Sequence, residues 1–143
     1  LWPAGIWAWH LALLLMLPSC WLLVGGLALP NPRSVSISRG AFDPQVPGLA
    51  GWVRHPVLWG FVLWAGVHLV ANGELVLALL FAIFLLFSLG GMAIIDRRKR
   101  RQMGEAFDQP LGRRWSGRQL LVTFGGGTLL YVLLLAAHPW LIG

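Results

Sequence analysis

The sequence predicts an all-α membrane protein, a bundle of four transmembrane helices, from its composition, its apolar stretches and the placement of its charges. Apolar residues make up 57% of the 143 residues and charged residues only 11%, and the mean hydropathy is +0.72. A soluble domain carries about twice that charged fraction. Four apolar stretches approach or exceed the roughly 20 residues that cross a bilayer, at residues 6–29, 55–72, 75–95 and 119–142. Because lipid offers no hydrogen bonds to the backbone, these spans are expected to be helices.

The charges fix the expected orientation. All eleven Lys and Arg residues fall in the segments 30–54 and 96–118, which lie on one side of a four-span chain. The positive-inside rule places both segments in the cytoplasm and the Asn72-Gly73 turn on the outer side. We therefore expect one transmembrane domain over residues 1–143, in contact with the bilayer and its anionic headgroups. This distribution argues against nucleic acid as a partner.

The first two spans carry clear helix signals. Trp7 and Trp9 open the first span, as an aromatic belt at the membrane surface does, and Pro18 is expected to kink it. Several prolines in residues 30–54 rule out a continuous helix there. Pro56 suits the first turn of the second span, where a missing N–H costs nothing.

The last two spans differ in character. Residues 75–95 are apolar all round, as expected for a lipid-facing helix, and Asp96 and the basic segment follow. Within residues 96–118 we expect an amphipathic piece with Phe107 and Trp115 facing lipid. The glycine triplet at residues 125–127 lies inside the fourth span, so it is expected to allow close helix packing.

The histidines separate into two groups by depth. His10, His68 and His138 come from three different spans and are expected near the outer surface, whereas His55 lies at the cytoplasmic end of the second span. His55 and His68 are 13 residues apart, or about 20 Å along a helix, so they cannot share one metal. Histidines on facing helices are how bundles hold haem or metal.

His68 is the strongest candidate ligand. It shares one helix face with Trp64, which can line a pocket, and with Asn72, which can accept a bond from the second ring nitrogen. The alternative for each histidine is an interfacial side chain bonded to backbone or water.

Four segments, RHPVLWG, LWAGVHLVANGE, DRRKRRQMGEAF and HPWLIG, occur in an order that resembles the NnrU-type family, which includes 15-cis-zeta-carotene isomerase. The resemblance implies a bacterial inner-membrane protein with cytoplasmic basic loops and a periplasmic turn at Asn72-Gly73. It further implies haem b with His68 as an iron ligand, and redox or isomerisation chemistry on a small or lipophilic molecule, or a role linked to denitrification. Family members carry one or two further N-terminal helices, which hold the second proposed ligand; here His10 or His138 is the expected substitute.

Two other functions stay open. The RHP-x-x-x-G pattern resembles isoprenylcysteine-type membrane methyltransferases, which implies S-adenosylmethionine at a cytoplasmic site formed by Arg54, His55 and Asp96; Leu58 and Asp96 stand where that family prefers Tyr and Glu. The small mass outside the spans also fits a non-catalytic accessory subunit of a larger membrane complex. The sequence therefore leaves open whether the chain is an enzyme.

Overall fold

The computed structural model describes residues 1–142, whose regular secondary structure is helical, with no strand among them. The helices are α1 (Ile6–Ala28), α2 (Pro56–Ala71), α3 (Leu75–Met103), α4 (Gly117–Leu120), the π-helical turn η3 (Leu121–Gly126) and α5 (Gly127–Ile142). Short 3-10 turns lie at η1 (Gly48–Gly51) and η2 (Gly104–Asp108). The predicted all-α class is confirmed.

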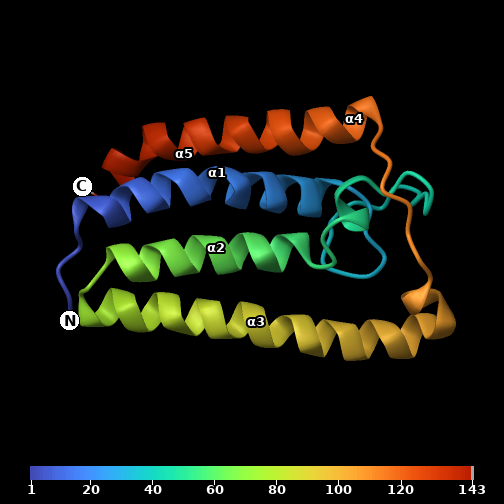
Figure 1. Ribbon diagram of the computed structural model, residues 1–143, viewed down its shortest axis with the longest axis horizontal. Helices are drawn as coiled ribbons and strands as arrows, with labels where there is room; N and C mark the ends of the chain where they lie inside the picture. The colour runs from blue at the N-terminus through green and yellow to red at the C-terminus, as the bar shows by residue number, and fades with distance from the viewer. Residues whose placement is uncertain (143) are drawn as a thin grey trace.

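The helices lie side by side in the order α5, α1, α2, α3, with neighbours antiparallel (Figure 1). Helix α1 contacts α2 on one side and α5 on the other, and α3 contacts α2. Residues 30–55 and 96–118 gather at one end of this layer, which we call the basic end. The α2–α3 turn and the start of α1 lie at the opposite end, which we call the histidine end.

Three of the long helices can cross a bilayer. Residues Ile6–Ala28, Leu75–Asp108 and Gly117–Leu141 each contain a window with a mean hydropathy of 2.1 or more. Helix α2 is as apolar but has only 16 residues. Most leucines, isoleucines and phenylalanines on α3 and α5 are exposed on the surface of the layer, as expected where lipid surrounds a helix. The chain is therefore a membrane protein.

Glycines bring α1 close to both of its neighbours. A Cβ on Gly26 would lie 2.7 Å from Val57 of α2, and one on Gly60 would lie 2.8 Å from Leu23 of α1. The Ser19 hydroxyl donates across the same interface to the Gly60 carbonyl at 2.7 Å. Small residues at these positions let the backbones approach closely enough for such a bond.

The fourth span begins with a capped α-helical turn, which continues into a wider π-helical turn. The Ser116 hydroxyl accepts from the Gln119 amide, and the Gln119 side chain accepts from the Ser116 amide, which forms a capping box. The π-helical turn follows directly and holds Thr123 against α1, where a Cβ on Gly25 would lie 2.7 Å from its hydroxyl oxygen. A π turn inserts one extra residue and so rotates the helix that follows it.

Helix α3 is longer than the sequence suggested. The second basic segment was expected to leave the helix at Asp96, but α3 continues to Met103. The charged run contains no helix breaker, and Lys and Arg are good helix formers. The helix stops at Gly104, whose φ of 60° lies in the left-handed region that glycine tolerates.

Candidate functional site

His68 lies in the last turns of α2, at the histidine end, and one of its ring nitrogens makes no hydrogen bond within residues 1–142. Nδ1 donates to the Trp64 carbonyl at 2.7 Å. Because that nitrogen carries the hydrogen, Nε2 of the neutral ring presents a lone pair. This is the tautomer in which a histidine binds a metal through Nε2 and is oriented by a bond from Nδ1.

Aromatic rings surround the His68 imidazole. The ring centroid lies 5.4 Å from Trp64 on the same helix and 5.0 Å from Phe81 of α3. Trp64 also meets Phe81 and Phe84 edge to face, at 5.3 Å and 5.5 Å. Trp64 therefore lies beside His68, where the sequence placed it, and the site is a half-buried imidazole in an aromatic wall between α2 and α3.

Asn72 makes a different contact from the one expected. Its amide nitrogen donates to the backbone carbonyl of His68 at 2.7 Å, so it ends the helix rather than orienting the ring. The acceptor for the ring is the Trp64 carbonyl, four residues earlier. Any helical histidine can reach that carbonyl, so no special residue was needed to supply the bond.

The other two histidines of this end belong to α1 and α5. His10 is exposed, and its Nδ1 donates to the Ile6 carbonyl at 2.9 Å, as in His68. His138 is half-buried near the end of α5. Within residues 1–142, however, no three His, Cys, Asp or Glu side chains gather into a metal-binding cluster. The three histidines share one end of the layer but not one cluster.

The basic end holds a buried polar network centred on His55. Its Nε2 donates to Asp96 of α3 at 2.9 Å, and its Nδ1 lies 2.6 Å from the Ser34 hydroxyl, in the loop after α1. Arg54 lies 3.7 Å from the same carboxylate. The structure thus brings Arg54, His55 and Asp96 together, and Ser34 completes the group.

This network has a structural character. His55 is only 3% exposed, and both of its ring nitrogens are bonded. A ligand at His55 would have to displace one of these bonds from a position closed to solvent. The network instead ties together three segments: the loop after α1, the start of α2 and the inner part of α3. Ser34 was missed because nothing near it in the sequence marks it as a partner of the distant RHP segment.

Phe107 lies beside the network, and its predicted exposure to lipid is wrong. Its side chain is completely buried, with the guanidinium groups of Arg54 and Arg100 at 4.5 Å and 4.8 Å from its ring centroid. Two cation–π contacts on one ring favour this buried position over exposure to lipid. Trp115 is half-buried against Phe124 of η3, with ring centroids 5.6 Å apart.

Comparison with known proteins gives one result. The family model described as NnrU protein matches residues 1–143, which is the whole chain. No curated protein and no solved structure matches the chain.

Proposed function

Because the chain belongs to the NnrU family, and because one of its membrane-embedded histidines has the form of a metal ligand, we propose that it is a haem-b-binding membrane protein that acts in redox or isomerisation chemistry. The observation that supports this proposal most is the environment of His68. Its Nδ1 donates to the Trp64 carbonyl, and its Nε2 has no hydrogen-bond partner within residues 1–142, beside the rings of Trp64 and Phe81. In this proposal His68 would hold the haem iron, and Trp64 and Phe81 would form part of an apolar wall for the group.

The second ligand comes from α5 or α1. His138 is the first candidate, because it is half-buried at the same end of the layer as His68. His10 is the second, because its Nε2 is free in the same way. The contacts of Gly25 with Thr123 and of Trp21 with Gly127 set the antiparallel register of α1 and α5. The same residue pairing, continued toward the histidine end, sets His10 of α1 opposite His138 of α5.

Each residue has a separate part in this proposal. Haem b, when bound, would supply one-electron redox chemistry. The Trp64 carbonyl fixes the His68 tautomer and raises the basicity of Nε2. The Phe81 ring, with its centroid 5.0 Å from that of the imidazole, shields one side of it from water. A lipophilic substrate can reach this end directly from the bilayer, since the surface of α3 beside His68 is apolar and exposed.

The test is a spectrum of the detergent-solubilised protein after addition of haemin. We expect a Soret band that His68→Ala abolishes and His68→Gln does not restore. His138→Ala is expected to change the low-spin spectrum of a two-histidine site to that of a one-histidine site, and His10→Ala tests the other candidate ligand in the same assay. An unchanged band in His68→Ala refutes the proposal, and loss of the signature only in His10→Ala moves the second ligand to α1.

The methyltransferase alternative receives less support from the geometry. It needs the imidazole of His55 to face a ligand, but that ring is enclosed and bonded at both nitrogens. Titration calorimetry with S-adenosylmethionine separates the two functions. We expect no heat of binding, and saturable binding that His55→Ala removes would favour the methyltransferase.

A further inference from the structure

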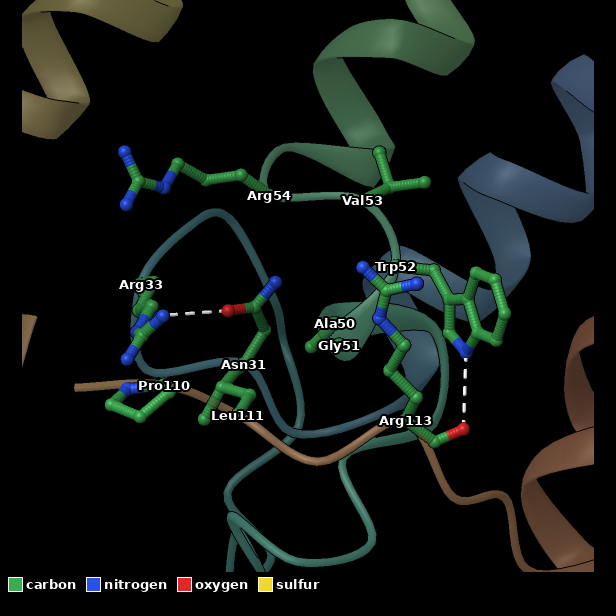
Figure 2. A pocket seen from close by; sticks show the side chains of 10 residues that line it. All are labelled: Asn31, Arg33, Ala50, Gly51, Trp52, Val53, Arg54, Pro110, Leu111 and Arg113. Carbon is green, nitrogen blue, oxygen red and sulfur yellow. Dashed lines mark hydrogen bonds between the residues drawn. The ribbon is translucent and has the colours of Figure 1, made fainter. Parts of the chain in front are cut away.

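A hollow of about 350 Å³ opens at the basic end, apart from the histidine site (Figure 2). Three arginines line it, Arg33, Arg54 and Arg113, and no Asp or Glu is among its described lining residues. Asn31 and Trp52 contribute the other hydrogen-bonding side chains of its wall. The lining is therefore rich in donors and positive charge.

Much of this positive charge is not balanced within the protein. Neither Arg33 nor Arg113 has a carboxylate within ion-pair distance among residues 1–142, and Arg54 has only Asp96 at 3.7 Å. Burial, and then the charge of Arg54, lower the pKa of the Arg33 guanidinium, and Asp108 only partly opposes them. An anion in the hollow would relieve this repulsion.

Asn31 supplies independent evidence for a missing acceptor. Its Oδ1 accepts from the Arg33 backbone amide at 3.0 Å, which fixes the orientation of the side chain. Its Nδ2 is buried and has no hydrogen-bond partner in the structure, and Figure 2 shows it directed away from that bond, between Arg33 and Arg113. Buried donors without partners are uncommon and costly. Because this nitrogen has almost no exposed area, the Asn31 side chain must turn toward the hollow for the nitrogen to reach an acceptor there.

The arginines are held in place before any ligand arrives. The Arg113 guanidinium stacks 5.0 Å from the Trp52 ring, and Trp52 Nε1 donates back to the Arg113 carbonyl at 3.2 Å. Arg33 donates to the backbone carbonyls of Gln109 and Ala106. Side chains fixed in this way lose less conformational entropy on binding.

We propose that this hollow binds a phosphate group through Arg33, Arg113 and the amide of Asn31, with Arg54 at its edge. Phosphate offers several acceptor oxygens and matches the fork of the guanidinium group. The hollow lies where the apolar helices end, next to Trp52, which is 57% exposed, as tryptophans at membrane surfaces are. The phosphate can therefore belong to an anionic lipid headgroup or to a soluble phosphorylated molecule.

The experiment uses the full chain in a non-ionic detergent, titrated with inorganic phosphate in one arm and short-chain phosphatidylglycerol in the other. Short-chain phosphatidylcholine is the zwitterionic comparison. Arg113→Gln is expected to weaken binding about tenfold, the worth of one charge-assisted hydrogen bond. Arg114→Gln is the matched control, since it removes the same charge from the neighbouring exposed residue, and is expected to change affinity by about twofold or less. Asn31→Asp, which brings a negative charge to the site, is expected to abolish binding.

The outcomes separate the sources of the phosphate. Binding of inorganic phosphate that competes with the lipid supports a soluble ligand, and binding of phosphatidylglycerol alone supports a headgroup. The proposal is overturned if neither probe binds saturably at millimolar concentrations, or if Arg114→Gln weakens binding as much as Arg113→Gln. Circular dichroism and the unliganded melting temperature of each variant show whether it is folded.

Discussion

Replacement of His55 by alanine tests whether the buried network holds the basic end together. The Ser34 hydroxyl is 4% exposed and bonds only to His55, so the variant leaves a buried hydroxyl unpaired, at a cost of about 1–3 kcal/mol. Asp96 loses one charge-assisted bond but keeps Arg54, and its side chain is 26% exposed, so this loss is about 1 kcal/mol. With the vacated ring volume, we expect a destabilisation of about 3 kcal/mol.

The measurement is the free energy of unfolding of the haem-free protein in mixed detergent micelles, followed by circular dichroism. The double variant Ser34→Ala/His55→Ala is expected to cost about 1 kcal/mol less than the two single variants together, because it leaves neither partner unpaired. His10→Ala is a matched control, because His10 is exposed and bonds only within its own helix. A His55→Ala variant as stable as that control would refute the argument that the network joins these segments.

Three other substitutions test the packing. Gly60→Leu is expected to force α1 and α2 apart and to lower the free energy of unfolding by about 2 kcal/mol, whereas Gly66→Leu, where no atom lies within 4 Å of an added Cβ, is the control with little effect. Thr123→Val replaces a buried hydroxyl that has no hydrogen-bond partner, so stability is expected to stay the same or rise; a loss of more than about 1 kcal/mol would show that the hydroxyl is bonded. Phe107→Ala is expected to cost about 3–5 kcal/mol and Phe107→Leu less, in the same unfolding assay; equal stability of Phe107→Ala and the native chain would contradict the burial of this ring.

The fold class was predictable because bilayer thickness dictates the length of an apolar helix. The expected span at residues 6–29 differs from α1 by one residue at its end. The end of α3 was not predictable from hydropathy, because hydropathy reports where the lipid ends rather than where the helix ends. Arg97 and the residues after it remain helical outside the apolar stretch, until Gly104 stops them.

The sites were less predictable, because they depend on contacts between distant segments. Counting helical turns from the charged segments predicted that His68 lies near the outer end of its helix. Its aromatic neighbours on α3 could not be predicted in this way, because they depend on the rotation of each helix about its own axis. The burial of Phe107 depends on Arg54, which precedes it by 53 residues. A local pattern of apolar and basic residues favours the membrane surface for such a ring and carries no sign of that partner.

The short α2 helix has a consequence for the surrounding membrane. Its 16 residues span about 24 Å, against about 30 Å for the hydrocarbon core that the longer helices fit. This hydrophobic mismatch is absorbed because α1 and α3 flank α2 in the layer (Figure 1). Because these two longer helices cover its sides, a short α2 requires less thinning of the surrounding lipid than it would as an isolated span.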